Sequence, residues 1–297
     1  MNNPVPSRYA ARTPTGYILT LSCADRPGIV FALSEFLLDH DCTIVECQQF
    51  VDRDAEKFFI RLQFEAAYDT SLELALLRID FHTVAARFGM NWHMSYASDK
   101  HRVLIMASKY GHCLNDLLFR TANGALNIDI VAVVCNHPDL GWMADSYNIP
   151  FHHIPVSGDT KANAEDRLRE LIDTLQVDLT VLARYMQILS PELCKQLEGR
   201  AINIHHSMLP SFKGARPYHQ AHSRGVKLIG ATAHYVTEDL DEGPIIEQEV
   251  ARVDHSMSAA DVTMLGRDTE CMALSRAVRW HTENRVLLDG HRTVVFP

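Results

Sequence analysis

IDIVAVVC, at residues 128–135, is the stretch that decides the fold, because it is apolar and rich in β-branched side chains. Such a run suits a parallel strand that is covered on both faces. Other apolar runs with strand character lie at residues 102–107, 151–154, 179–183 and 201–205. Helical patterns separate them at residues 113–122, 139–147, 163–175 and 191–197. This alternation predicts an α/β fold with an open, doubly wound, mostly parallel sheet and helices on both faces.

The pattern changes on both sides of this region. Further strands are predicted at 228–236 and 245–253, followed by a long helix at 258–284, so that one domain spans residues 102–297. Before it, strands at 17–23, 43–51, 58–64 and 92–97 alternate with helices at 29–38 and 71–88. The order β-α-β-β-α-β predicts a ferredoxin-like domain over residues 17–97. Residues 98–101 form a polar linker, and residues 1–16 form a loose leader.

Composition limits the classes of function. The 297 residues are 47% hydrophobic and 22% charged, as in globular proteins, and a prior of roughly 150 residues per domain predicts about two domains. The net charge of −9 argues against nucleic acid or an anionic membrane as a partner. No apolar run is long enough to span a membrane, and no signal peptide pattern is present. We therefore expect a cytoplasmic protein whose seven cysteines, with no CxxC pair, are free thiols.

The densest group of polar residues within apolar surroundings lies at residues 203–244. Asn203 and His205 are two positions apart at the end of a predicted strand, so their side chains share a face. Taken alone, this spacing is more typical of a turn cap and a half-buried histidine than of a functional site. The acidic run around Asp241, which ends in Gly-Pro, is by itself typical of a solvated loop.

Together, NIHHSMLP at 203–210 and HYVTEDLDEGPII at 234–246 resemble the folate-dependent formyltransferase family. The resemblance covers about residues 102–285 and implies that Asn203, His205 and Asp241 are catalytic. LARYMQILSP, at 182–191, resembles the family segment that holds the pterin ring. The folate-binding residues that the resemblance implies are Arg184, Met186, Leu189, Thr237 and Leu240.

The chemistry of these side chains suits that role. A nucleophile that attacks the formyl group of 10-formyltetrahydrofolate creates an oxyanion. The amide of Asn203 and a protonated His205 can donate to it, each such donor contributing about 3 kcal/mol. Asp241 can keep His205 charged and accept the proton of the nucleophile. Gly243 and Pro244 would end the loop sharply and hold Asp241 toward the crevice.

The nucleophile is indicated by a departure from the family pattern. Formyltransferases that act on a phosphorylated amine carry a Gly-rich phosphate loop after the first sheet strand, whereas this chain has ASKYGHCL at 107–114. This departure resembles the formyltetrahydrofolate deformylases, in which water attacks and formate is released. His112 would line the vacated amine site. Two alternatives stay open: a formyltransferase with an unphosphorylated amine acceptor, and a catalytically silent amino-acid or folate sensor.

The N-terminal domain carries a second resemblance. LSCADRPGIV, at 21–30, is similar to the signature of ACT modules, which implies an amino-acid effector site at Asp25, Gly28 and Ile29. The open alternative is a structural turn and dimer interface without a ligand. Because ACT modules commonly pair, we expect a homodimer or homotetramer. The pathway stays open between formate supply for purine synthesis and the balancing of folate pools.

We expect no prosthetic group and no metal. The dinucleotide fingerprint GxGxxG is absent after residues 102–107. The adjacent histidine pairs at 152–153 and 205–206 would face opposite sides of a strand, and no HExxH motif supports them.

Overall fold

The computed structural model describes residues 16–67, 72–209 and 217–297. It divides the chain into two compact units, one reaching Asp99 and one extending from Lys100 to Val295. The predicted leader, apart from Gly16, lies outside the described residues. So do residue 71, at the predicted start of a helix, and Pro210 of the NIHHSMLP motif.

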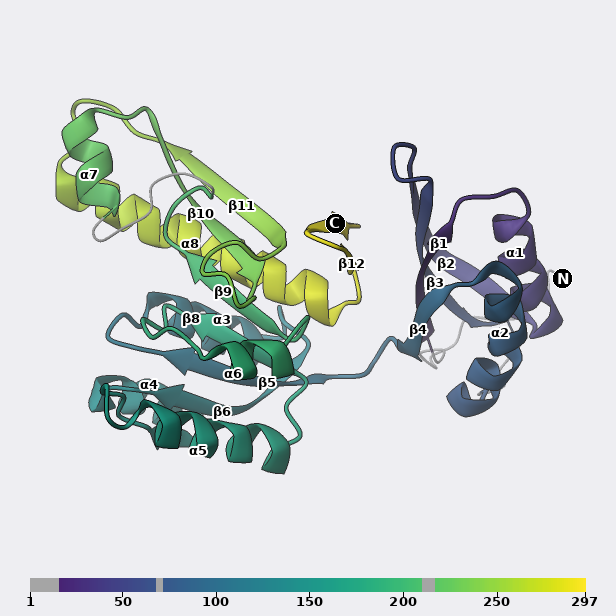
Figure 1. Cartoon of the computed structure of the whole chain (residues 1–297), viewed down its shortest axis with the longest axis horizontal. Coiled ribbons are helices and arrows are strands. Elements are labelled where there is room, and N and C mark those ends of the chain that lie inside the picture. The colour runs from purple at the N-terminus through teal and green to yellow at the C-terminus, as the bar shows by residue number, and fades with distance from the viewer. Residues whose placement is uncertain (1–15, 68–71, 210–216) are drawn as a thin grey trace, which may run out of the picture. The chain divides into compact units, whose positions relative to one another are not determined.

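The N-terminal unit has the predicted β-α-β-β-α-β order. Its elements are β1 (Gly16–Ala24), α1 (Ile29–Asp39), β2 (Cys42–Asp52), β3 (Lys57–Ala66), α2 (Leu74–Phe88) and β4 (Asn91–Tyr96). The sheet order is β2-β3-β1-β4, and every pairing is antiparallel. Figure 1 shows α1 and α2 on one face of this sheet, where their apolar sides bury a core that includes Leu33 and Phe81. The ferredoxin-like order is confirmed.

The second unit is built on a sheet of seven strands in the order β11-β10-β9-β8-β5-β6-β7. The strands are β5 (His101–Ala107), β6 (Ile128–Cys135), β7 (Phe151–His153), β8 (Leu179–Ala183), β9 (Ala201–His205), β10 (Leu228–Tyr235) and β11 (Ile245–Arg252). The pairings among β5 to β9 are parallel, whereas β10 and β11 are antiparallel additions at one edge. The predicted mostly parallel sheet is therefore confirmed.

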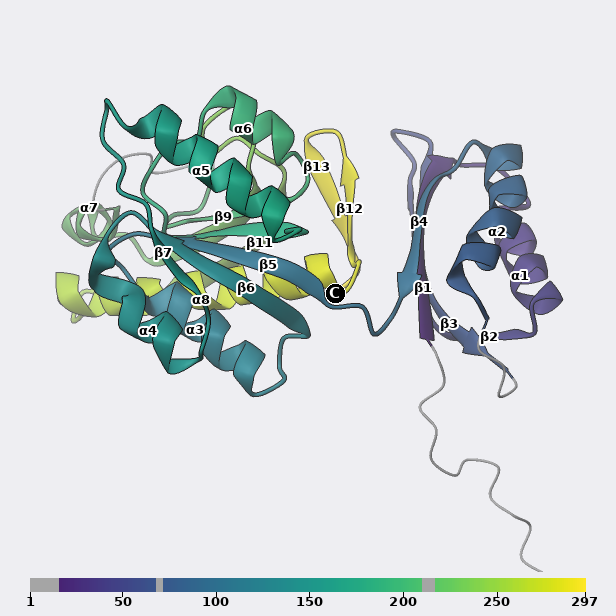
Figure 2. The ribbon, with the colours of Figure 1, turned by 90° about the horizontal axis from the view of Figure 1, so that it is seen from below.

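Helices cover both faces of this sheet, as Figure 2 shows. The α-helices are α3 (His112–Ala122), α4 (Gly141–Ser146), α5 (Lys161–Thr174), α6 (Pro191–Gln196), α7 (Pro217–Arg224) and α8 (Ala259–Thr282). Side chains of β5 alternate between two cores: Val103 and Ile105 pack with α3 and α8, while Leu104 and Met106 pack with α5 and α6. The run 128–135 is buried apart from Asp129, as its composition predicts.

Several elements differ from the sequence-based expectation. The predicted helix at 139–147 is a short 3-10 turn (Pro138–Leu140) followed by α4. The hairpin β12 (Val286–Asp289) and β13 (Arg292–Val295) is not predicted, although Gly290, with φ 60° at the first position of its two-residue turn, is typical of a hairpin. Within the described residues, no helix is long and apolar enough to cross a membrane.

Candidate active site

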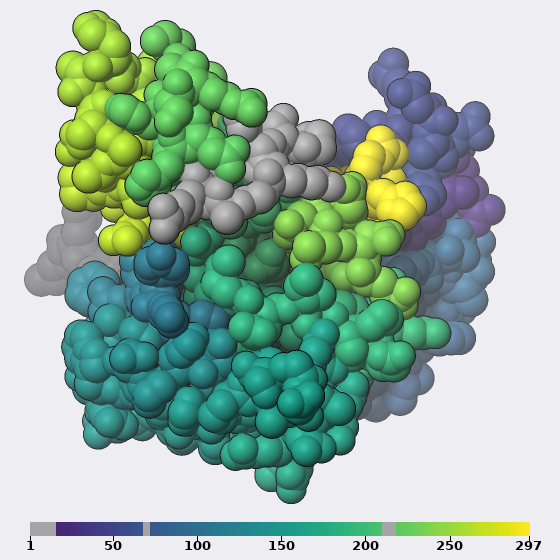
Figure 3. Space-filling view, turned by 60° about the vertical axis from the view of Figure 1, so that its left-hand side comes forward, coloured from purple at the N-terminus to yellow at the C-terminus, as the bar shows by residue number. Residues whose placement is uncertain are grey.

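A cavity of about 230 Å³ lies where β8 and β9 end, in the second unit. Its walls are the segment that follows β8, the end of β9 and the loop between β10 and β11. Open parallel sheets bind ligands beyond the carboxyl ends of their strands. In the space-filling view the surface is hollowed among the green segments (Figure 3).

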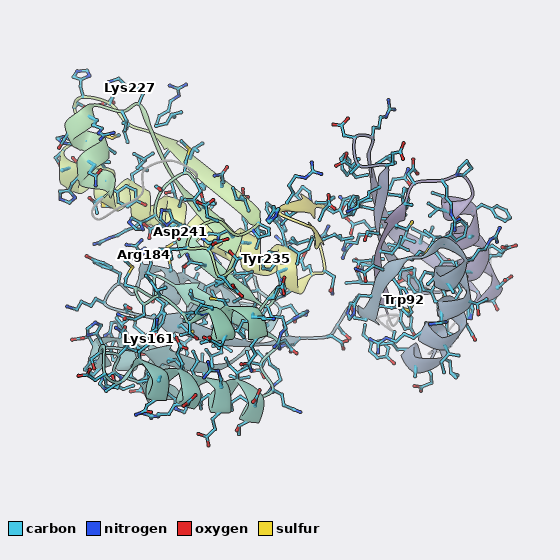
Figure 4. All side chains as sticks on the ribbon, in the orientation of Figure 1. Trp92, Lys161, Arg184, Lys227, Tyr235 and Asp241 are labelled. Atoms are coloured by element: carbon cyan, nitrogen blue, oxygen red, sulfur yellow. The ribbon has the colours of Figure 1, made fainter. Side chains whose placement is uncertain are left out.

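Most predicted site residues line this cavity. They are Asn203, His205, Asp241, Arg184, Met186, Leu189, Thr237 and Leu240. Figure 4 shows Arg184 and Asp241 beside one another, although they come from segments 57 positions apart. His112 does not line the cavity, because its Nε2 is turned to the Oε2 of Glu270, 2.7 Å away. The predicted effector residues Asp25, Gly28 and Ile29 lie in the N-terminal unit, at the turn before α1 and its first residue.

His205 and Asp241 lie in direct contact at the cavity. The Nδ1 of His205 lies 3.2 Å from the Oδ1 of Asp241. Burial raises the pKa of Asp241, but the hydrogen bond and charge of His205 outweigh burial, so the pKa of this carboxyl is lowered overall. Asp241 is therefore ionised near neutral pH and accepts the Nδ1 proton. The opposite nitrogen, Nε2, is buried without a hydrogen-bond partner in the described part of the chain.

Asn203 is held by a residue that the sequence analysis missed. His234 is the cross-strand partner of Asn203 between β9 and β10, and its Nε2 lies 3.2 Å from the Asn203 Nδ2. The Nδ1 of His234 donates to the carbonyl oxygen of Tyr235 at 2.8 Å, and burial lowers the pKa of His234. The ring is therefore neutral, and its Nε2 accepts one amide proton of Asn203. The second amide proton remains for a ligand.

The loop that carries Asp241 is shaped by close backbone approach. Asp241 has φ 59°, a left-handed conformation that Asp tolerates better than most residues. A Cβ on Gly243 would lie 1.8 Å from the carbonyl oxygen of Tyr235, so only glycine fits there. The Tyr235 N–H donates to the carbonyl oxygen of Pro244 at 2.9 Å, which closes the loop.

The wall after β8 is anchored at both ends. The hydroxyl of Ser108, just after β5, accepts the Met186 N–H at 2.9 Å and donates to the Oδ1 of Asn136 at 2.7 Å. At the other end, the Ser190 N–H donates to Glu165 at 2.8 Å. The Ser190 side chain also caps α6, as predicted from the sequence.

A buried carboxylate lies behind Arg184. Glu270, on α8, is 1% exposed and accepts hydrogen bonds from His112 at 2.7 Å and Tyr218 at 2.6 Å. The Nε of Arg184 lies 3.3 Å from the Oε2 of Glu270. Burial raises the pKa of Glu270, but these partners outweigh burial and the pKa is lowered overall. The sequence analysis missed Glu270 and Tyr218, because only tertiary packing brings α7 and α8 to this place.

Two observations bear on metal binding. His112, Cys113 and Glu270 offer ligand atoms within 4.8 Å of one another. The hydrogen bond of His112 and the positive charge of Arg184 already neutralise Glu270, so we assign no ion to this cluster.

The expectation that His205 and His206 face opposite sides is wrong, because His206 follows the last residue of β9 and both line the cavity. Burial lowers the pKa of His206 to about 4, so this ring is neutral.

Comparison with known proteins identifies the family. A family model described as formyl transferase matches residues 101–278. A formyltetrahydrofolate deformylase from Corynebacterium sp. (strain P-1) is 54% identical over 280 residues, which cover 94% of this chain and 97% of the relative. The chain belongs to the formyltetrahydrofolate deformylase family.

Solved structures support this assignment over the whole fold. The structure of a formyltetrahydrofolate deformylase from Burkholderia mallei has a TM-score of 0.91 and 51% identity, and the match covers 96% of this chain and all of that one. The structure of a glycinamide ribonucleotide transformylase 1 from Symbiobacterium toebii has a TM-score of 0.63 and 27% identity. This match covers 67% of this chain and 95% of the transformylase chain. The likeness to deformylases thus extends over far more of the chain than the likeness to this transformylase.

Proposed function

We propose that this chain hydrolyses 10-formyltetrahydrofolate to tetrahydrofolate and formate at the cavity beside β8 and β9. The activity follows the family, and the observation that carries the choice of site is the His205–Asp241 pair. The ionised carboxylate lies 3.2 Å from the imidazole, and the other imidazole nitrogen is buried without a partner among the described residues. Such a pair can accept and donate protons during the reaction. Met186, Ile188 and Leu240, exposed apolar residues that line the cavity, would contact the flat pterin ring.

The reaction needs a group that accepts a proton from water and groups that donate hydrogen bonds to the oxyanion. The oxygen of water adds to the formyl carbon, and one water proton passes to Asp241, directly or through a second water. The carbonyl oxygen becomes an oxyanion, which the free N–H of Asn203 and the Nε2 proton of a protonated His205 stabilise. Collapse breaks the carbon–N10 bond, N10 takes the proton that Asp241 holds, directly or through water, and formic acid ionises to formate.

Each polar neighbour has a defined part in this scheme. Asp241 keeps the Nδ1 proton of His205 in place, so that Nε2 faces the reacting carbonyl. His234 accepts one proton of the Asn203 amide and so fixes its rotation. His234 is therefore a positioning residue in this proposal.

The test is formate release without an acceptor. Purified protein is incubated with 10-formyltetrahydrofolate, and formate is measured with a coupled assay. We expect steady release that falls about 10²-fold or more in Asp241→Asn, since positioned proton transfer contributes about 10²–10⁴-fold. Asp173→Asn, at an exposed position of α5, is the matched control and should keep native activity. Release only after an amine is added would indicate a transferase, and no turnover at all would indicate a sensor.

We also propose that residues 17–97 form an ACT-type effector module, joined by residues 98–101 to the catalytic domain 102–297. Gly28 has φ 97° at the start of α1, and no side chain among the described residues caps this helix, so its first N–H groups are available for the carboxylate of an amino acid. Calorimetry with glycine and methionine tests this site. Sedimentation tests the proposed homodimer or homotetramer, and cell fractionation tests the proposed cytoplasmic location.

A further inference from the structure

The cavity holds buried hydrogen-bond donors that have no partner among the described residues, and the hydrolysis scheme does not use all of them. Among the described residues, the Nε and Nη1 of Arg184 are buried and make no hydrogen bond, as is the case for the Nε2 of His205. Both side chains line the same cavity, and Arg184 is only 9% exposed. Buried polar atoms in folded proteins nearly always have a partner, so an orphaned guanidinium in a cavity indicates a missing ligand.

The surroundings of Arg184 fix its orientation but leave two of its nitrogens without a hydrogen bond. Glu270 lies 3.3 Å from the Arg184 Nε in a contact that is not a hydrogen bond, and its two oxygens accept from His112 and Tyr218. The Tyr110 ring lies 5.7 Å from the guanidinium carbon and covers one face of the group. Glu270 thus balances the charge of Arg184, and the unpartnered Nη1 stays available for a ligand.

We propose that Arg184 and His205 form the binding site for formate, the second product of the reaction. This inference rests on the proposed deformylase function. A guanidinium matches a carboxylate in shape, with two parallel N–H···O bonds. The Nε2 of His205, which lines the same cavity, supplies a further donor to the carboxylate. The formyl group is neutral in the substrate and becomes a carboxylate only after cleavage. Arg184 therefore pairs with a carboxylate charge that the substrate lacks and the product carries.

The experiment measures formate affinity directly, with sodium formate as the probe. Isothermal titration is run at constant ionic strength, with sodium chloride replacing sodium formate, on the full chain saturated with tetrahydrofolate. Arg184→Gln should weaken formate binding by about tenfold or more, because it removes charge-assisted hydrogen bonds. Arg184→Lys, which keeps a positive charge near Glu270 but loses the fork, should fall in between. Arg169→Gln, on α5, is the matched control and should bind formate like the native chain.

The outcomes separate this inference from the proposed function. Unchanged formate affinity in both Arg184 variants overturns the inference even when the native chain releases formate from 10-formyltetrahydrofolate. Formate binding that depends on Arg184 in a chain without turnover supports the anion site and refutes the deformylase. Equal competition by chloride overturns a site built for a carboxylate. A circular dichroism spectrum and a melting temperature close to those of the native chain show that a variant is folded, and Arg184→Lys carries the test where Arg184→Gln does not fold.

Discussion

Gly243→Ala is a one-methyl change that should disable the candidate site without touching a catalytic side chain. The added Cβ would lie 1.8 Å from the carbonyl oxygen of Tyr235, 2.9 Å from its carbonyl carbon and 3.2 Å from the Nδ1 of His234. Two backbone segments meet there, so no side-chain rotation relieves the clash. The segments must separate by about 1 Å, and a misplacement of that size at a catalytic group costs about 10²-fold in rate.

The same change should lower stability by a measurable amount. Forcing a methyl group into a packed site costs about 1–3 kcal/mol. For a unit of about 200 residues each kcal/mol lowers the melting temperature by about 2–4 °C, which gives a decrease of about 2–12 °C. Formate release at saturating substrate and a calorimetric melt measure the two effects. Gly158→Ala is the control, because a Cβ there meets nothing within 4 Å.

The outcome that would refute this reasoning is specific. A Gly243→Ala protein that keeps native turnover would show that the loop moves without displacing Asp241. A protein that melts at a lower temperature but keeps its turnover would separate the packing role of Gly243 from the site.

Three further predictions concern the groups around the cavity. His234→Phe removes the acceptor for the Asn203 amide, so kcat should fall about tenfold with KM nearly unchanged, and a rise in KM alone would contradict the positioning role. The lowered pKa of Asp241 contributes stability that is present above its unfolded value of about 3.9 and is lost as pH falls through the lower folded value. Melting temperatures of native protein and Asp241→Asn should therefore differ at pH 6 and converge below pH of about 4. Ser108→Ala leaves the partly buried Met186 N–H without its acceptor, so urea unfolding should show a loss of about 1–3 kcal/mol, and an unchanged midpoint would contradict the anchoring role.

The strands and helices could be predicted from the sequence, because interactions between residues close in the chain decide where each of them begins and ends. The strands at 179–183 and 201–205 end where predicted, since β-branched apolar runs give way there to polar residues. Ser190 caps α6 as predicted because a cap needs only its own residue and the next turn. Asn203 and His205 come to the same cavity for a similar reason, since alternation along a strand places both on one face.

Contacts across the fold escaped prediction because they depend on register and packing. His234 reaches Asn203 only because β10 pairs antiparallel with β9 at that register. Glu270 lies within a helix whose apolar pattern predicts a core element, and nothing local marks it as the buried carboxylate behind Arg184. His112 is turned away from the cavity by this same carboxylate.

The left-handed backbone at Arg184 and Asp241 has a consequence for protein engineering. With φ of 64° and 59°, both residues occupy a conformation that costs about 1–2 kcal/mol for most side chains and almost nothing for glycine. Glycine at position 241 would remove this backbone cost, but it would also remove the carboxylate whose pairing with His205 adds stability at neutral pH. Directed evolution of this scaffold therefore needs turnover as its criterion at every round, because heat resistance alone responds to both of these opposing effects.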